Sequence, residues 1–397
     1  MVESFFLIDK TILIARSMVE EAINLTPDKK VLIVFNYPLG ENLAEEIGRV
    51  CDSKKSRKIV FFPRDLEREV ALACQRSEKP IQNYFSKLKK VNDWAEAIFL
   101  IRAVKNPEIF QKMPKKRQRL FDQLSHEIIK RRVEGKVPWC LIYWPTEYEA
   151  KKENLDYETY FNLFWQACNQ PWLEIKKAQQ KLIKKLNRGK ILQIEANQND
   201  GNLKRRTKLK MSIKGMTFIN STIDMNYPGS EVYSAPVLKS VEGQIFYPGE
   251  YQRQGKSIKN IFLKFKRGQI KEFSASEGEE FLKEFLNQDE GAKYLGEIAF
   301  GTNPGLRRKF FNSLLNEKVG GSIHLAVGHC YENEKDKDGQ LVKVNNGNTQ
   351  NKTSLHWDLS LLMHPQFGGG KVILDGEVIQ ENGQFLDPKL AILNPKI

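Results

Sequence analysis

Cysteine and histidine are both scarce in this chain of 397 residues, which contains five of each. The cysteines are Cys51, Cys74, Cys140, Cys168 and Cys330. They are odd in number, lie far apart and form no CxxC pair, which argues against a disulfide framework and against a zinc knuckle. We expect reduced thiols, and Cys330 stays open as a soft metal ligand.

Long apolar runs are also missing. No run reaches the roughly 18 residues that a membrane helix needs. Glu3, Asp9 and Lys10 interrupt the first segment, where a secretory signal would be apolar. The sequence therefore predicts a cytoplasmic protein with no membrane partner.

A glycine-rich phosphate loop is absent after the first predicted strand, where Gly40 stands alone and neither GxGxxG nor GxxxxGK[ST] occurs. A nucleotide site thus has little support. The chain is basic, with 63 Lys and Arg against 49 Asp and Glu and a net charge of +14, which leaves a nucleic-acid-binding protein as an alternative. Lysines spread over both halves and no nucleic-acid module motif occurs, so a lysine-rich surface is the simpler interpretation and a nucleic-acid partner is not expected.

The length exceeds the roughly 250–300 residues that one core usually organises, so we expect two domains. In residues 1–188, short apolar runs alternate with helical patterns, which predicts an α/β domain with a mainly parallel sheet. The runs are 31–35, 58–62, 97–101 and 139–144. A helix predicted over 171–189 closes this domain. In residues 189–397, short strands follow one another between Gly, Asn and Asp turns, which predicts a second domain built around antiparallel strands.

Residues 296–358 concentrate the metal-binding chemistry. Four of the five histidines, His324, His329, His356 and His364, lie between 324 and 364, and His126 stands alone upstream. Neutral imidazole and carboxylate are the common ligands of divalent cations. A single strand histidine is more often an ordinary core residue than a ligand.

His356 and Asp358 strengthen the metal interpretation, because residues i and i+2 of a strand share one face and can hold one ion together. Glu231 follows a Pro-Gly turn and begins a predicted strand, where it can reach a metal, but this signal taken alone favours a surface glutamate. Glu297 begins an apolar strand, and a buried carboxylate needs a partner such as a cation.

These segments, taken in order, resemble a known family. They are Asn226 to Pro236, Gly296 to Ala299, Asn316 to Gly328, Tyr331 and His356 to Asp358. The set is similar to the metalloaminopeptidases typified by thermophilic aminopeptidase T, and weaker likeness elsewhere extends over nearly the whole chain. The departures are Gly229-Ser230, where the family often has Asp-Gly, and the long polar segment 332–352, which we expect to form a surface loop that affects substrate access.

The resemblance implies that two divalent metal ions (Zn, Co, Mn or Mg) are bound in the second domain. The implied ligands are Glu231, Glu297, Glu317, His324, His356 and Asp358. Glu297 is our candidate for the bridging ligand, Tyr331 for the donor to the substrate carbonyl, and Glu297 or Glu317 for proton transfer. The family also implies peptide substrates with a free N-terminus and a homodimer. A metallohydrolase for another amide or ester is the nearest alternative to an aminopeptidase.

Overall fold

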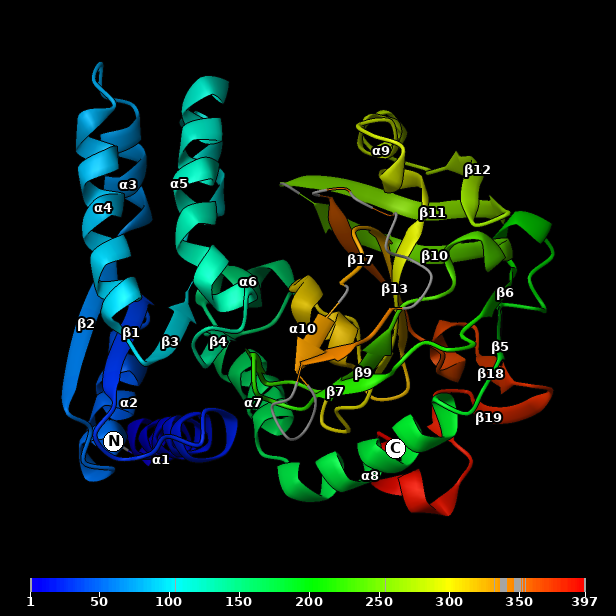
Figure 1. The fold of residues 1–397 in the computed structure, drawn as a ribbon, viewed down its shortest axis with the longest axis horizontal. Coiled ribbons are helices and arrows are strands. Elements are labelled where there is room, and N and C mark those ends of the chain that lie inside the picture. Colours follow the sequence, from blue (N-terminus) through cyan, green and yellow to red (C-terminus); the bar gives the residue numbers. More distant parts are fainter. Residues whose placement is uncertain are drawn as a thin grey trace. The chain divides into compact units, whose positions relative to one another are not determined.

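The computed structural model describes residues 2–103, 105–253, 255–331, 333–335, 341–345, 351, 353 and 355–395. Its contacts divide the chain into two units, unit 1 with Met1–Asn169 and Ile223–Pro228, and unit 2 with Gln170–Thr222 and Gly229–Ile397. The chain therefore returns once from unit 2 to unit 1 (Figure 1). Among the described residues, no helix has the length and apolar character needed to cross a membrane.

Unit 1 contains one parallel sheet, as the alternating pattern predicts. Its strands lie in the order β2 (Lys58–Arg64), β1 (Lys30–Asn36), β3 (Ala97–Arg102), β4 (Trp139–Tyr143) and β8 (Asn226–Tyr227). Every neighbouring pair is parallel. β1 and β3 are buried along nearly their whole length because they lie inside the sheet, which explains their continuous apolar runs.

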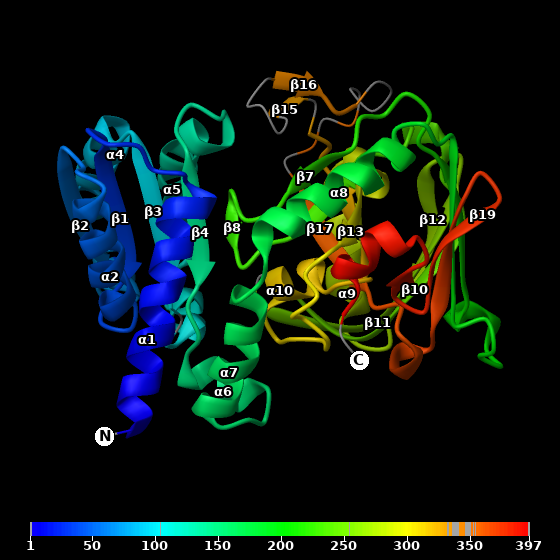
Figure 2. The ribbon, with the colours of Figure 1, turned by 90° about the horizontal axis from the view of Figure 1, so that it is seen from below.

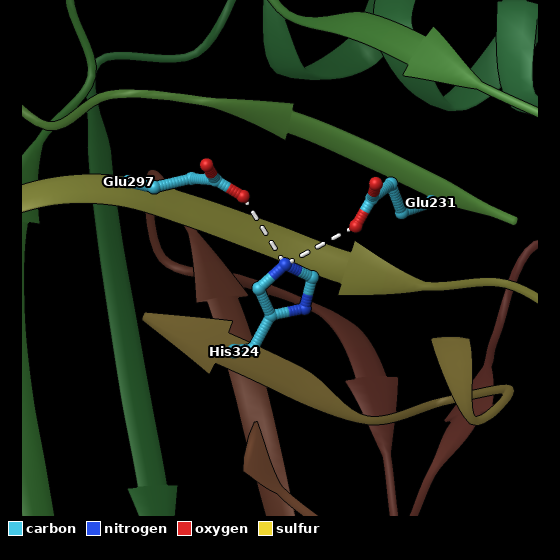
Figure 3. Close-up of side chains that lie close together, drawn as sticks. All are labelled: Glu231, Glu297 and His324. Atoms are coloured by element: carbon cyan, nitrogen blue, oxygen red, sulfur yellow. Dashed lines mark hydrogen bonds and ion pairs between the residues drawn. The ribbon is translucent and has the colours of Figure 1, made fainter. Parts of the chain in front are cut away.

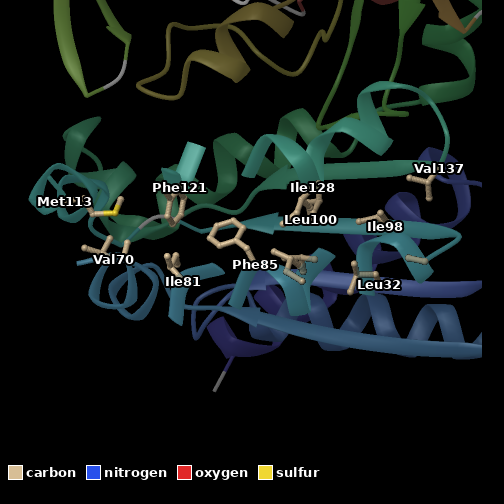
Figure 4. Close-up of a cluster of buried hydrophobic side chains, with 14 residues drawn as sticks. Leu32, Val70, Ile81, Phe85, Ile98, Leu100, Met113, Phe121, Ile128 and Val137 are labelled. Atoms are coloured by element: carbon tan, nitrogen blue, oxygen red, sulfur yellow. The ribbon is translucent and has the colours of Figure 1, made fainter. Parts of the chain in front are cut away.

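Helices connect these strands. They are α1 (Val2–Ser17), the π-helix η1 (Met18–Ala22), α2 (Glu41–Ser53), α3 (Leu66–Ala73), α4 (Lys79–Trp94), the 3-10 helix η2 (Pro107–Lys112), α5 (Lys115–Val133), α6 (Glu147–Lys152) and α7 (Tyr157–Cys168). Figure 4 shows the core that joins Leu32 and Leu100 of the sheet to Phe85 of α4 and Phe121 of α5. The rings of Phe85 and Phe121 pack edge to face with centroids 5.0 Å apart. α4 and α5 therefore cover one face of the sheet.

Unit 2 contains two larger antiparallel sheets (Figure 2). The first has the order β12 (Gln269–Ser274), β11 (Lys256–Lys266), β10 (Glu242–Arg253), β6 (Thr207–Ser212), β5 (Ile191–Ala196), β18 (Gly370–Leu374), β19 (Glu377–Glu381) and β20 (Gln384–Phe385). The second has the order β17 (His356–Leu361), β14 (Ile323–Gly328), β13 (Leu295–Gly301), β9 (Glu231–Ser234) and β7 (Ile219–Ser221). The prediction of a parallel-sheet domain followed by antiparallel strands is confirmed.

Short helices complete unit 2. They are α8 (Trp172–Leu186), α9 (Glu279–Leu286) and α10 (Ser313–Lys318), with 3-10 turns η3 (Leu203–Arg205), η4 (Leu238–Ser240), η5 (Gly291–Lys293), η6 (Pro365–Phe367) and η7 (Pro388–Leu393). The helix predicted over 171–189 is α8. It belongs to unit 2, whereas the predicted boundary at residues 188 and 189 put it in the first domain.

The polar segment 332–352 is described only in part. Residues 332, 336–340, 346–350 and 352 lie outside the described residues, so the predicted loop and its effect on access stay predictions. The described parts form a small hairpin, β15 (Asn333–Lys335) with β16 (Leu341–Lys343). Beyond it, the carbonyl of Val344 accepts hydrogen bonds from Thr217 N at 3.2 Å and Ser234 Oγ at 3.1 Å.

Gln179 explains why α8 belongs with the second unit. Its side chain is fully buried, and its Nε2 donates to Ser230 Oγ at 2.6 Å and to Thr302 Oγ1 at 2.9 Å. Its Oε1 accepts from Asn220 Nδ2 at 2.9 Å and from Thr222 Oγ1 at 2.7 Å. One amide thus joins α8 to β7 and the residue after it, to the residue before β9, and to the residue after β13. It thereby fixes the residue before Glu231.

We expect Gln179→Leu to lower the free energy of unfolding by about 1–3 kcal/mol or more, because leucine fills the space but leaves buried polar groups without a partner. Urea unfolding of the two proteins measures the difference. Gln180→Leu is the matched control, since Gln180 makes one hydrogen bond, from Nε2 to Asn220 Oδ1 at 3.0 Å, and is only half-buried. Equal losses for the two variants would show that the amide network contributes nothing specific.

Candidate metal centre

The register of the five-stranded sheet puts most of the predicted ligands on one face. Glu297 of β13 lies opposite Ala326 of β14, which lies opposite Asp358 of β17. His324 lies two residues from Ala326 and pairs with Ala299. Because side chains alternate between the two faces of a sheet, and residues opposite each other share a face, these five side chains point to the same side.

Small residues on that face leave room between the polar side chains. Glu231, the first residue of β9, pairs with Gly301 of β13, and Ala299 and Ala326 separate the other ligand positions. At Gly301 a Cβ would lie only 2.2 Å from Val319 O. A side chain there would push away the segment that follows α10 and carries the chain to His324.

Two groups of side chains on this face could each hold a metal ion. The first comprises Glu231, Glu297 and His324, and the second Glu297, His356 and Asp358. His324 Nε2 lies 3.1 Å from Glu297 Oε1 and 3.2 Å from Glu231 Oε2 (Figure 3). His356 Nε2 lies 3.6 Å from Glu297 Oε2 and 3.3 Å from Asp358 Oδ1. Glu297 thus belongs to both groups, with one oxygen near His324 and the other near His356. It lies within β13, whereas the sequence predicted it at the start of a strand.

A backbone contact sets the orientation of His356. Its Nδ1 lies 3.0 Å from the carbonyl oxygen of His329. A carbonyl can only accept, so the proton stands on Nδ1 and Nε2 faces the carboxylates of Glu297 and Asp358. His329 therefore serves the centre through its main chain.

The imidazoles of His324 and His356 both have strongly raised pKa values. Burial alone would lower the pKa of His324, but the neighbouring carboxylates of Glu231 and Glu297 raise it to about 10. The pKa of His356 is likewise raised to about 9, by Asp358 and Glu297 against burial. A cation that binds here must displace protons from these imidazoles.

Glu317 and Lys318 end α10 beside the first group. Lys318 Nζ lies 2.6 Å from Glu231 Oε1 and 3.2 Å from Glu317 Oε2, and its side chain is only 3% exposed. Burial would raise the pKa of Glu231, but Lys318 and His324 outweigh it and lower that pKa to about 2. For Glu317 burial dominates and raises the pKa to about 8.

Lys318 is the residue that the sequence prediction missed. It stands inside the Asn316–Gly328 segment that resembles the family, and the signal available for it was its position next to Glu317. A lysine surrounded by carboxylates cannot be deduced from sequence, because only the turn after α10 brings Glu231 within reach. Glu317 itself lies outside both groups of possible ligands.

Of the remaining candidate residues, Tyr331 lies near the metal centre, whereas Cys330, His364 and His126 join neither group of possible ligands. Tyr331 is near the second group, with its ring 5.3 Å from that of His356. The thiol of Cys330 contacts Asn345 Nδ2 at 2.8 Å, and neither Cys330 nor His364 joins a possible metal group among the described residues. His126 is an exposed residue of α5 in unit 1.

Residues 9–385 match a family described as "Thermophilic metalloprotease (M29)". The chain belongs to the M29 metalloproteases. The resemblance that the motifs indicated is thereby confirmed, and a divalent metal at this centre agrees with the donor set, which consists of carboxylate oxygens and imidazole nitrogens.

Curated M29-like relatives share one part of the sequence. Aminopeptidase T of Thermus thermophilus is 34% identical over 129 residues, which are 31% of this chain and 31% of that protein. Aminopeptidase AmpS of Bacillus subtilis is 36% identical over 110 residues, 27% of this chain and 26% of that protein. The aligned part thus spans less than a third of either relative.

Two solved structures share the fold over nearly the whole chain. Wild-type AmpT from Thermus thermophilus superposes with a TM-score of 0.75 and 17% identity, covering 95% of this chain and 99% of that one. A 2,5-dihydroxypyridine dioxygenase from Pseudomonas putida superposes with a TM-score of 0.57 and 10% identity, over 96% of this chain and 98% of that one. At such low identities the likeness establishes the fold alone.

We expect the metal-free protein to lose thermal stability as the pH rises from 6.5 to 9. The folded state holds protons on His324 and His356 that the unfolded chain releases near pH 6.5. The folded state then binds more protons in this window, so its stability is complete below pH 6.5 and falls as the pH approaches the folded pKa values. Melting curves in excess EDTA measure the slope.

His356→Gln should flatten this slope, and His126→Gln, which removes an exposed histidine of unit 1, should leave it unchanged. A melting temperature in EDTA that stays constant or rises between pH 6.5 and 9 would contradict the proposed charge balance.

Proposed function

We propose that this M29 metalloprotease is an aminopeptidase that removes the N-terminal residue of peptides with the help of two divalent ions. The observation that carries the proposal is the position of Glu297, whose two oxygens face two different groups of possible ligands. A carboxylate in that position is suited to bridge two ions. The names of the similar curated proteins support the choice of aminopeptidase among peptidases.

In this proposal Glu231, Glu297 and His324 hold one ion, and Glu297, His356 and Asp358 hold the other. Hard carboxylate oxygens with one imidazole in each set fit Zn, Co, Mn or Mg. Ions bound there would supply a water of lowered pKa and positive charge beside the developing oxyanion. No side chain then has to act as a covalent nucleophile.

Proton transfer falls to Glu317 more readily than to Glu297. Both oxygens of Glu297 face histidine nitrogens, so none is left for a proton. Glu317 lies outside both groups and burial raises its pKa to about 8, near the value at which a carboxylate can take a proton from water and return it to the leaving amine at neutral pH. Lys318, 3.2 Å away, holds Glu317 in place.

Tyr331 is suited to donate a hydrogen bond to the substrate carbonyl as charge develops there. Its ring packs against Ile219, Tyr233, Ala299 and Val344, next to His356, which holds the phenol at the edge of the ligand cluster. An ion bound in this cluster would also offer a ligand position to the unprotonated amine of a free N-terminus, which favours an exopeptidase.

Three further expectations stay predictions: the homodimer, the cytoplasmic location and the absence of a nucleic-acid partner. Another amide or an ester is the alternative substrate, and the assays below include it.

The first test is hydrolysis of aminoacyl-p-nitroanilides by the full-length protein after EDTA treatment, with and without added Co²⁺, Zn²⁺, Mn²⁺ or Mg²⁺. We expect metal to restore cleavage of free-amine substrates, because the chelated protein lacks the charge that activates water. N-acetylated p-nitroanilides and p-nitrophenyl acetate serve as controls. Restored cleavage of the acetylated anilides or the ester alone would favour the alternative metallohydrolase, and no cleavage under any metal would refute both.

The second test separates the ligand role from the proton-transfer role. Glu297→Gln should abolish activity and lower the metal content, because one residue serves both ions. Glu317→Gln should keep the metal and lower kcat by about 10²–10⁴, the usual contribution of a general base. Tyr331→Phe should also keep the metal and lower kcat.

Metal content, measured by atomic emission, and kcat on one free-amine substrate distinguish a metal ligand from a residue that transfers the proton. Glu277→Gln is the matched control, because Glu277 is exposed and paired only with Lys259. If Glu317→Gln loses metal as Glu297→Gln does, Glu317 is a ligand, as first predicted, and another group transfers the proton.

A further inference from the structure

A cavity of 540 Å³ in unit 1 is lined by none of the residues of the metal centre. Its walls include residues 36–39, which end or follow β1, and residues 102–103 and 105–106, which end or follow β3. β1 lies between β2 and β3 in the sheet. The connection after β1 therefore runs to β2 on one side, and the connection after β2 runs back past β1 to β3 on the other side. In open parallel sheets, ligands bind at the carboxyl ends of the strands at such a switch point.

Three arginines, Arg64, Arg102 and Arg132, line this cavity. Arg64 is neutralised by a paired carboxylate: its Nε lies 2.7 Å from Glu69 Oε1 and its second nitrogen contacts Glu69 Oε2. Tyr84 also donates to Glu69 Oε1 at 2.8 Å. The acceptors of Glu69 are thereby occupied, and its single negative charge stands against the three guanidinium groups that line the cavity.

Among the described residues, neither Arg102 nor Arg132 forms an ion pair with a carboxylate, and Glu69 acts on Arg102 only through its charge. Burial and the charge of Arg64 lower the pKa of Arg102. Burial and the charges of Arg102 and Arg64 lower the pKa of Arg132 to about 10. Both remain positively charged at neutral pH, so two cations lie close together in a partly desolvated place, with the Arg132 guanidinium 5.8 Å from the Trp139 ring centroid. Asp65 and Glu67, which also line the cavity, are exposed to solvent.

The buried polar atoms nearby are donors that lack acceptors. Arg132 is 8% exposed, and its Nε has no hydrogen-bond partner among the described residues. Asn92 is 2% exposed, and its Nδ2 is likewise without a partner in that part of the chain. Both residues, together with Arg64 and Arg102, line a smaller void of 30 Å³. Its other walls include Phe85 and Ile128 of the core in Figure 4.

We propose that this cavity binds a small organic anion, whose carboxylate or phosphate group is held by Arg102 and Arg132. An anionic oxygen accepts hydrogen bonds and carries the charge that the two guanidinium groups lack, and arginine is the residue that recognises both groups best. Most of the other lining side chains are apolar or aromatic, among them Leu66, Ile109 and Tyr143. The cavity has the size of a typical small-molecule site, so the anion should carry an apolar or aromatic body.

The experiment is isothermal titration of the full-length protein, as purified, with phenyl phosphate, with benzoate and with benzyl alcohol. The first two carry the same ring with a different anionic group, and the third carries no charge. We expect at least one anion to bind and the alcohol not to bind. The stronger of the two anions identifies the class of the natural ligand.

Arg132→Gln and Arg102→Gln should each weaken anion binding about tenfold or more, because each removes a hydrogen bond to a charged group. Arg119→Gln is the matched control, since Arg119 is an exposed arginine of the same helix, α5, and should keep the affinity of the parent protein. Two variants guard against a fold defect in one of them.

The melting temperature without ligand is a second readout, and here the variant should not be impaired. Without ligand, Arg132→Gln should melt no lower than the parent protein, because the substitution removes repulsion between buried like charges, while the rise in melting temperature that the anion causes should disappear. If neither anion binds, if benzyl alcohol binds as well as they do, or if the parent protein and Arg132→Gln bind equally, the proposal is wrong.

Discussion

The concentration of negative charge on one face of the sheet β17-β14-β13-β9-β7 is the constraint on which the centre depends. Glu231, Glu297, Glu317 and Asp358 meet there with side chains between 8% and 22% exposed. Carboxylates so little hydrated are costly unless cations compensate them. Lys318 is the permanent cation, and the two histidines add charge only while protonated.

This balance explains both the local sequence and the expected need for metal. The strand alternation allows acidic side chains on one face only if the positions between them are small, which they are at Ala299, Gly301 and Ala326. Protons and divalent ions then compete for the same nitrogens and oxygens. The site is held together by whichever cation occupies it, while β13 and β14 supply a rigid frame.

The fold alone would not have identified this chemistry. The structure superposes on AmpT from Thermus thermophilus and on a protein named as a dioxygenase, with 17% and 10% identity. The antiparallel sheet in unit 2 is thus a scaffold on which different side chains can be placed. The chemistry of this chain is indicated by the set of donors on that sheet, above all the carboxylate of Glu297 between two histidines.

Local patterns were enough to predict the alternating strands of unit 1, because β1 and β3 are apolar runs buried within one sheet. They also placed His356 and Asp358 on one face of one strand. Contacts between distant segments were not predictable in this way. β8, only two residues long, pairs with β4. α8 packs on η7, β7 and β9 of unit 2, and its buried amide Gln179 bonds to residues 41–123 positions away. Lys318 beside Glu231 is the same kind of long-range effect.

At the metal centre and at the cavity of unit 1, the balance of buried hydrogen-bond donors and acceptors indicates the charge of the expected ligand, which sequence motifs do not. At the metal centre of unit 2, the poorly exposed side chains are mainly carboxylates, which accept hydrogen bonds and need cations beside them. Around the cavity of unit 1 and the smaller void, the unsatisfied atoms are donors, Arg132 Nε and Asn92 Nδ2. They lie with two guanidinium groups that form no ion pair within the described part of the chain. The absence of a glycine-rich phosphate loop argued against a nucleotide there, but it excluded only recognition by backbone amides. Arginine side chains from β3 and α5 offer another way to bind an anion, and they carry no motif because the sheet, not the sequence spacing, brings them together.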